Sequence, residues 1–270
     1  MKFGIKGGYC SPKSNPLELA LLRRYHARIQ ELKRTKTPKG DFKPAKGPYA
    51  ELYNQEVAIM KRRINPGDTL LDAGAGYGRL VEGALEAGAA HVMALEPDQN
   101  ALNVLSEKFG TDERVEITKG FVQDLSFLKD KTMDIVAFVG NNLGMMWGID
   151  GEWDQIICEQ KEAIQEMIRV ARREVAFIVY GKATIESSLK AYEPLHRNII
   201  WIHDGLMLVE EKDDKPYRIG TEGAELERFV FQKFDRQYLE QLLKDVNVSN
   251  YSIVEIPKEK DYGYLVTIQI

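Results

Sequence analysis

The chain has 270 residues, of which 44% are hydrophobic and 29% are charged, so it can bury one large domain or a domain with an appendage. No apolar run approaches the roughly 18 residues of a membrane span, and the first residues lack the apolar core of a signal peptide. The two cysteines, Cys10 and Cys158, form neither a disulfide framework nor a metal set. We therefore expect a cytoplasmic protein with reduced thiols.

Charge is distributed unevenly along the chain. The net charge is -4, but residues 1–46 contain twelve lysines or arginines and three acids, which gives this arm +9 and leaves -13 for the rest. So basic a block can meet nucleic acid or an anionic ligand, or it can be a solvated arm that is helical around residues 16–34. A loop rich in proline and glycine joins the arm to the remaining chain.

After the arm, helical and strand patterns alternate. Helical spacing at residues 49–64 is followed by a short buried strand at 69–74, which ends in a glycine loop. The pattern then predicts a helix at 79–88, a strand at 91–97, a helix at 98–110 between an Asp98 cap and a Gly110 stop, strands at 115–120 and 133–140, a helix at 154–171 and a strand at 174–181. Residues 182–230 break this rhythm, before a helix at 236–246 and strands at 250–256 and 262–270.

Strands that are apolar on both faces and alternate with helices are typical of a parallel, doubly wound α/β sheet. The charged turn at 257–261 joins the last two strands into a predicted hairpin, so the final strand should run antiparallel. We expect a Rossmann-like α/β domain over residues 47–270, with a seven-stranded sheet, the helical arm 1–46 before it and the insertion 182–230 ahead of the final helix.

The stretch TLLDAGAGYGRL, residues 69–80, indicates what kind of ligand the chain binds. Gly74, Gly76 and Gly78 let the backbone approach a ligand at the carboxyl end of the first strand. Dinucleotide enzymes use G-x-G-x-x-G there, but Arg79 stands at the third glycine position. Asp72 would also repel a phosphate, because like charges about 6 Å apart cost about 2.8 kcal/mol at an effective dielectric near 20. The loop therefore favours a ligand that is cationic there, such as S-adenosylmethionine.

Residues 70–80 resemble motif I, [D/E]-x-G-x-G-x-G, of the class I S-adenosylmethionine-dependent methyltransferases. The resemblance covers about residues 49–180 and resumes at about 229–270. It implies the sheet order of that family, S-adenosyl-L-methionine as the cofactor, and an acid at the second strand tip that binds the ribose. Glu96 occupies that tip, 24 residues after Asp72, with Pro97 beside it.

The third strand tip reads GFVQDLSF, residues 120–127, where the family often has GDAxDLPF. Asp124 matches the second aspartate of that pattern, and Phe121 replaces the first. The resemblance implies that Val122, Gln123 and Asp124 contact the adenine. Alternatively, Asp124 caps the turn that follows.

The fourth tip, residues 138–143, resembles that of glycine N-methyltransferase-like enzymes that act on small amines. The resemblance implies that the backbone of Val139 and Gly140 flanks the methionine part of the cofactor. It also implies that Asn141 and Asn142 contact the acceptor, although an Asn-Asn pair is equally typical of a plain turn.

Arg79 and Tyr53 are candidates for the methionine carboxylate, because guanidinium and phenol groups are suitable donors. The catalytic residue remains open. The candidates for a base are His196 and His203 in the insertion and Tyr180 at the end of the fifth strand.

The absence of several motifs narrows the range of methyl acceptors that we expect. The sequence has no [DNS]-P-P-[YF] motif of enzymes that methylate adenine, no Pro-Cys pair of 5-methylcytosine enzymes and no zinc ligand cluster. Methyl transfer to a neutral amine depends mainly on alignment, whereas a hydroxyl acceptor needs a base. We predict a methyltransferase that acts on a nitrogen of a small molecule, with residues 182–230 as a lid. The alternatives are an RNA (tRNA) methyltransferase that uses the basic arm, and a non-catalytic protein that binds S-adenosylmethionine.

Overall fold

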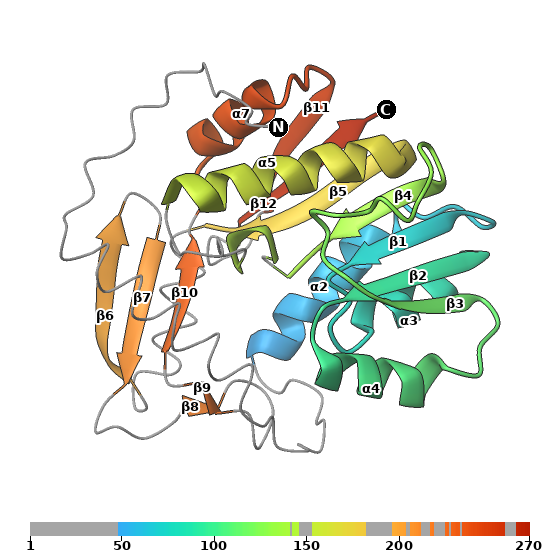
Figure 1. Ribbon diagram of the computed structural model, residues 1–270, viewed down its shortest axis with the longest axis horizontal. Coiled ribbons are helices and arrows are strands. Elements are labelled where there is room, and N and C mark those ends of the chain that lie inside the picture. The colour runs from blue at the N-terminus through green and yellow to red at the C-terminus, as the bar shows by residue number, and fades with distance from the viewer. Residues whose placement is uncertain are drawn as a thin grey trace.

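Figure 1 shows the computed structural model of the protein, which is built around a seven-stranded sheet. The structure describes residues 48–140, 142–145, 153–181, 196–203, 206–211, 217–218, 225–226, 228–232, 234–256 and 263–270. The predicted basic arm, Asn141 and a large part of the insertion lie outside the described residues. None of the helices in the described ranges is long and apolar enough to span a membrane.

The strand order is β11–β12–β5–β4–β1–β2–β3, which confirms the predicted doubly wound α/β sheet. The strands are β1 (Thr69–Ala73), β2 (His91–Glu96), β3 (Val115–Lys119), β4 (Met133–Phe138), β5 (Ala171–Tyr180), β11 (Tyr251–Ile256) and β12 (Gly263–Gln269). β1 to β5 pair in parallel, whereas β12 is antiparallel to both β5 and β11. The predicted C-terminal hairpin with an antiparallel last strand is therefore confirmed.

Helices cover both faces of the sheet. α2 (Pro48–Lys61), α3 (Arg79–Glu86) and α4 (Gln99–Phe109) pack on one face, and α5 (Trp153–Val170) and α7 (Arg236–Asp245) pack on the other. The first core contains Leu80 and Leu105, and the second contains Met167 and Leu239. Because the central strands carry buried side chains on both faces, they read as continuous apolar runs in the sequence.

Local signals set several boundaries correctly. Asp98 caps α4 by accepting hydrogen bonds from the N–H groups of Asn100 and Ala101, and Gly110 lies at its other end. The predicted boundary between α5 and β5 is wrong, because the helix ends at Val170 and β5 begins at Ala171.

Two arginines explain that error. Arg172 and Arg173 lie between the predicted helix and the predicted strand, but both belong to β5, where each pairs with an acid at or just before the start of another strand. Arg172 forms an ion pair with Asp134, and Arg173 donates two hydrogen bonds to the carboxylate of Asp68. These ion pairs lie at the amino edge of the sheet.

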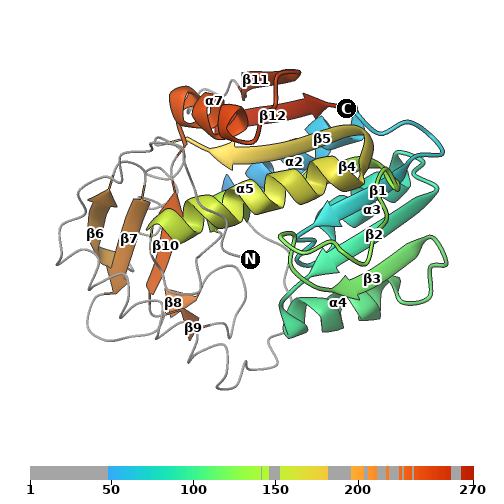
Figure 2. The ribbon, with the colours of Figure 1, turned by 45° about the horizontal axis from the view of Figure 1, so that its top comes forward.

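The insertion forms a small sheet that the sequence pattern did not predict. β6 (His196–His203), β7 (Leu206–Glu211) and β10 (Arg228–Gln232) pair antiparallel in the order β10–β7–β6, and β8 (Tyr217–Arg218) pairs with β9 (Glu225–Leu226). Figures 1 and 2 place this sheet beyond the carboxyl ends of the main strands. The N–H of Phe234 donates to the carbonyl of Tyr180 at 3.0 Å, so the insertion leaves and rejoins the domain at the tip of β5.

Candidate functional site

The loop between β1 and α3 contains three glycines with left-handed backbone, Gly74 (φ 82°), Gly76 (φ 53°) and Gly78 (φ 82°). A Cβ at Gly74 would collide with the side chain of Asn142, and a Cβ at Gly78 would collide with the ring of Phe109. A Cβ at Gly76 would meet nothing within 4 Å. Gly74 and Gly78 therefore permit close packing inside the protein, whereas the backbone of Gly76 has room for a ligand to approach.

The carboxylate of Glu96, at the tip of β2, holds this loop in place. Its Oε2 accepts a hydrogen bond from the N–H of Gly76 at 2.8 Å, and its Oε1 accepts one from the backbone N–H of Asp98 at 2.9 Å. The N–H groups of Gly74 and Ala75 both donate to the carbonyl of Leu95, the residue before Glu96. The tips of β1 and β2 are thus fixed to each other, with a buried acid between them.

Asp72, one residue before the end of β1, is almost completely buried at 1% exposure. Its Oδ2 has no hydrogen-bond partner within the described part of the chain. Burial raises the pKa of Asp72 from 3.8 to about 7, the Arg79 guanidinium opposes that rise, and the charge of Glu96 adds to it. A buried, unneutralised carboxylate of this kind is stabilised by a nearby cation.

Arg79, the first residue of α3, belongs to a second group of side chains at the same edge. Its guanidinium lies 3.5 Å from the centroid of the Tyr53 ring, a cation–π contact, and 3.9 Å from the carboxylate of Glu56. The hydroxyl of Tyr180 donates to the other oxygen of Glu56 at 2.8 Å. A Cβ at Gly140 would lie 3.7 Å from Arg79 and 4.0 Å from Glu56, so this group borders the tip of β4.

At the third tip, Val122 is buried, Gln123 is half-buried and Asp124 is exposed. Asp124 accepts a hydrogen bond from the N–H of Ser126 at 3.2 Å, which is the turn cap that the sequence offered as an alternative. Hydrogen bonds from the side chain and then the N–H of Ser126 lower the pKa of Asp124, so the carboxylate is charged and able to accept further bonds. The side-chain amide of Gln123 donates to Glu159 of α5 at 3.4 Å.

At the fourth tip, the short 3-10 helix η1 (Asn142–Met145) follows β4. The amide of Asn142 donates to the carbonyl of Gly74 at 3.0 Å, which ties this tip to the glycine loop. Gln160 of α5 donates to the carbonyl of Leu143 and accepts from the hydroxyl of Tyr238 at 2.7 Å. The side-chain NH₂ group of Asn142 is therefore hydrogen-bonded within the protein, and the contact of Asn142 with an acceptor stays a prediction.

Glu56 and Gln160 were missed by the sequence analysis, although both are fully buried at this edge. Glu56 follows Tyr53 by three residues and precedes Met60 by four, which places an acid on the apolar side of α2. That spacing could have identified it. Gln160 has no comparable signal, because its partners come from η1 and α7, which are distant in sequence.

The structure describes no side chain for three of the predicted site residues. Asn141 lies outside the described residues, and His196 and His203 are the first and last residues of β6, whose side chains are not described. In the described ranges, no three histidine, cysteine or acidic side chains gather in a way that could hold a metal ion.

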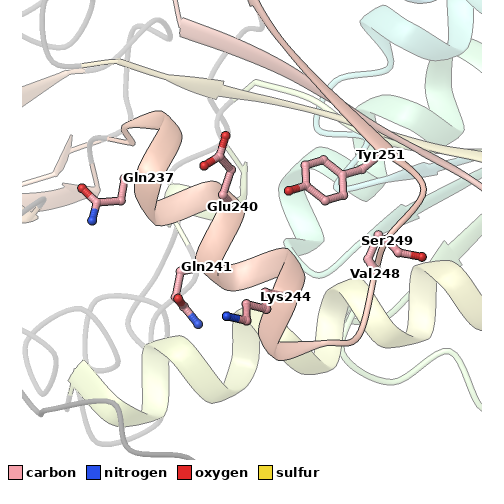
Figure 3. Close-up of a pocket in the computed structure, with 7 residues that line it drawn as sticks. All are labelled: Gln237, Glu240, Gln241, Lys244, Val248, Ser249 and Tyr251. Carbon is pink, nitrogen blue, oxygen red and sulfur yellow. The ribbon is translucent and has the colours of Figure 1, made fainter.

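Figure 3 shows a separate pocket of about 490 Å³, lined by one side of α7, with Gln237 and Lys244, and by Tyr251. Tyr251 begins β11, which is the edge strand of the sheet, and pairs with Ile268, which pairs with Val175 in the middle of β5. The pocket therefore lies beside the β11 edge of the sheet and not at the tips of the first four strands. It contains none of the candidate site residues.

A glycine loop and buried acids at two strand tips thus lie together at the carboxyl edge of a doubly wound sheet. Residues 70–174 match a family model described as a methyltransferase domain. The matched residues include the glycine loop, Glu96, the third and fourth tips and α5. This chain contains a class I S-adenosylmethionine-dependent methyltransferase domain. It is an enzyme, and its cofactor is S-adenosyl-L-methionine.

Solved structures share the fold of this methyltransferase. The PH0226 protein from Pyrococcus horikoshii is 17% identical with a TM-score of 0.63, over 88% of this chain and 98% of its own. Magnesium protoporphyrin IX methyltransferase from Synechocystis, solved with bound S-adenosylhomocysteine, is 13% identical with a TM-score of 0.51, over 93% and 98%.

A third similar structure is the 1,6-didemethyltoxoflavin-N1-methyltransferase of Burkholderia thailandensis, bound to 1,6-didemethyltoxoflavin and S-adenosylhomocysteine. It is 17% identical with a TM-score of 0.50, over 97% of this chain and 92% of its own. No curated protein sequence matches this methyltransferase. At these identities, the solved structures establish the fold and leave the acceptor open.

The methyltransferase site fits the charge of its cofactor. The Asp72 oxygen without a hydrogen-bond partner suits the ammonium or sulfonium of S-adenosylmethionine, and the uncovered backbone at Gly76 permits a close approach. A pyrophosphate would place like charge beside Asp72 and Glu96, both of which are buried.

Proposed function

We propose that this enzyme transfers the methyl group of S-adenosylmethionine to a nitrogen of a small-molecule acceptor, and that the cofactor lies across the first four strand tips. The observation that carries the cofactor placement is Asp72, a carboxylate buried beside a glycine loop. Its charged form is disfavoured in this low-dielectric site until a cation approaches. The cofactor brings two cationic groups and no phosphate.

Glu96 is the proposed ribose ligand. Two backbone N–H groups fix its carboxylate, and each carboxylate oxygen has two lone pairs, so both oxygens can also accept a ribose hydroxyl. A side chain fixed in this way loses little entropy when the ligand binds. The position of the ribose then follows from the hydrogen bonds already present at the β2 tip.

The other contacts follow from the neighbouring tips. Val122, Gln123 and Asp124, with Pro97 on the β2 side, are placed around the adenine. Arg79, held between the Tyr53 ring and Glu56, is the proposed donor to the methionine carboxylate. The backbone of Val139 and Gly140 would flank the methionine chain, because Gly140 lies next to Arg79.

The cofactor supplies an electrophilic methyl group when it is bound, so the protein mainly has to align the acceptor. Holding reactants in line can replace about 7 to 11 kcal/mol of the barrier. Tyr180 borders the β4 tip, and its proton is committed to Glu56, so its oxygen can accept a hydrogen bond from an acceptor N–H. An amine oriented in this way still has to arrive without a proton on its lone pair.

The insertion is the proposed lid over the acceptor site. It leaves after Tyr180 and returns at Phe234, so its base adjoins the tyrosine that would orient the acceptor. Its small sheet lies beyond the strand tips (Figure 2). A lid here would exclude water and complete the pocket, and His196 and His203 of β6 remain candidates for a catalytic base within it.

A small acceptor is also consistent with the N1-methyltransferase of the same fold, which was solved with 1,6-didemethyltoxoflavin bound. The competing proposal is an RNA acceptor. Its support is the +9 charge of residues 1–46, which could contact phosphates along a tRNA. The two proposals differ in how strongly activity should depend on salt.

The test measures S-adenosylhomocysteine production by the full-length protein with panels of small amines, small alcohols and tRNA. We expect turnover with an amine, and an activity that changes little between about 50 and 200 mM salt. Turnover with tRNA that falls by roughly 10³-fold or more over that range would instead establish the RNA proposal. Turnover with alcohols alone would show that the acceptor atom is oxygen.

A further inference from the structure

The connection between β3 and β4, residues 120–132, runs along α5 and is fastened to it by one arginine. Arg169, in the last turn of α5, donates to the carbonyl of Leu125 at 2.8 Å and to that of Leu128 at 2.9 Å. It also donates to the carboxylate of Asp130 at 2.8 Å. A single guanidinium therefore holds three points of the connection, which uses the fork geometry that only arginine offers.

Glu166 completes this attachment. Both of its oxygens accept from Arg169, at 2.8 and 2.7 Å, and one of them also accepts from the N–H of Leu125 at 2.9 Å. Both backbone polar groups of Leu125 are thus bound by the same ion pair, and its side chain is fully buried. The hydrogen bond from Arg169 lowers the pKa of Glu166, so the pair remains charged over the neutral range.

The attachment is adjacent to the segment assigned to the adenine. Leu125 immediately follows Asp124, and Gln123 is bonded to Glu159, which lies two helical turns before Glu166 on α5. Val122 and Leu125 are buried, and the polar side chains of Gln123 and Asp124 lie between these two anchors. α5 therefore holds the Gln123 side chain and the backbone that follows Asp124, while Ser126 orients the Asp124 carboxylate on that fixed backbone.

We infer that Arg169 and Glu166 are positioning residues for base recognition: they hold the 122–125 segment so that the site accepts adenine and rejects hypoxanthine. The inference rests on the proposed placement of the adenine at Val122, Gln123 and Asp124. Adenine presents an amino donor where hypoxanthine presents a carbonyl acceptor. A fixed Asp124 carboxylate accepts from the amino group and repels the carbonyl, whereas a loose segment can turn to accommodate either base.

The test compares S-adenosylhomocysteine with S-inosylhomocysteine, which differ only in the base, by calorimetric titration of the full-length protein. Arg169→Lys keeps the charge but cannot bridge two carbonyls and two acids. Arg172→Lys is the matched control, because Arg172 binds the far end of the same connection through the carbonyls of Lys131 and Thr132 and the carboxylate of Asp134. The readout is the ratio of the two dissociation constants in each protein.

We expect the wild type and Arg172→Lys to prefer the adenine ligand by about tenfold or more, as one charged hydrogen bond allows. In Arg169→Lys that preference should fall by about fivefold or more, with the loss falling mainly on the adenine ligand. Equal preference in all three proteins would show that Arg169 only stabilises the fold and would overturn the inference. If the wild type binds neither ligand, the proposed function itself fails.

A second variant tests the inference if Arg169→Lys fails to fold. Glu166→Gln keeps the carbonyl contacts of Arg169, removes the ion pair and weakens the hydrogen bond from the Leu125 N–H, so it should fold and lose part of the base preference. Hydrogen exchange supplies a second measurement, because the Leu125 amide should exchange faster in Glu166→Gln than in the wild type. An unchanged amide together with an unchanged preference contradicts the positioning role.

Discussion

Asp72→Asn should make the protein more stable and the cofactor site weaker. Burial raises the pKa of Asp72 from 3.8 to about 7, so the folded protein holds this proton over a pH range in which the unfolded chain has lost it. Stability contributed by this group therefore falls as the pH rises from about 4 to 7. A difference of about 3 pKa units corresponds to a loss of at most about 4 kcal/mol in the free energy of unfolding. This loss is complete by about pH 8.

The assay is urea denaturation of wild type and Asp72→Asn at about pH 5 and about pH 8, analysed by linear extrapolation. Asparagine has the same shape and no charge, so the variant should be more stable at the higher pH, by about 1 to 4 kcal/mol. The gain should be much smaller at the lower pH. Other titrating groups cancel, because each comparison is made at one pH.

The same variant should bind S-adenosylmethionine more weakly. If Asp72 faces the sulfonium, S-adenosylmethionine loses more affinity than S-adenosylhomocysteine, which is uncharged at sulfur. If Asp72 faces the ammonium, both ligands lose the same amount of affinity. A variant that is no more stable at about pH 8 and binds both ligands normally would refute the electrostatic role given to this carboxylate.

The remaining predictions concern the same edge of the sheet. Glu96→Ala should weaken cofactor binding by about 1.5 to 3 kcal/mol in calorimetry, and unchanged affinity would remove Glu96 from the site. Gly76→Val should abolish binding, whereas Gly67→Val should not, although both glycines have positive φ and open space around them; equal binding by both variants would make the loop purely structural. Arg79→Met should weaken S-adenosylmethionine and S-adenosylhomocysteine alike, since both carry the carboxylate, and a selective effect would contradict that assignment. Near pH 7, binding should release a fraction of a proton, seen as a heat that depends on the buffer, and an Asp72→Asn protein that releases as much would assign the proton elsewhere.

Much of the fold followed from local signals in the sequence. The Asp98 cap, the Gly110 stop and the apolar strands needed no tertiary information. The edge on which Asp72 and Glu96 meet also followed, because the carboxyl ends of parallel strands share one side of a sheet.

The separate roles of the glycines could not be predicted in the same way. Gly78 is required by the Phe109 ring, 31 residues away, and Gly74 by the side chain of Asn142, 68 residues away. Sequence spacing alone made the three positions look equivalent. Only their tertiary neighbours distinguish the one that faces open space.

The small sheet in the insertion was missed for a different reason. Residues 198–202 contain three isoleucines and a tryptophan, and residues 206–209 form a short apolar run; both are usual strand signals. Residues 182–230 interrupt the alternation of strands and helices, so the alternation pattern does not predict strands there. An antiparallel sheet needs no helices between its strands, and the small sheet could therefore form within this segment.

The most direct test of the account is a competition titration of the full-length protein with S-adenosylmethionine and NAD. The carboxylates of Asp72 and Glu96 should exclude the pyrophosphate, so S-adenosylmethionine should saturate one site per chain and excess NAD should not displace it. Saturable binding of NAD that competes with S-adenosylmethionine, or no binding of S-adenosylmethionine at all, would contradict the account.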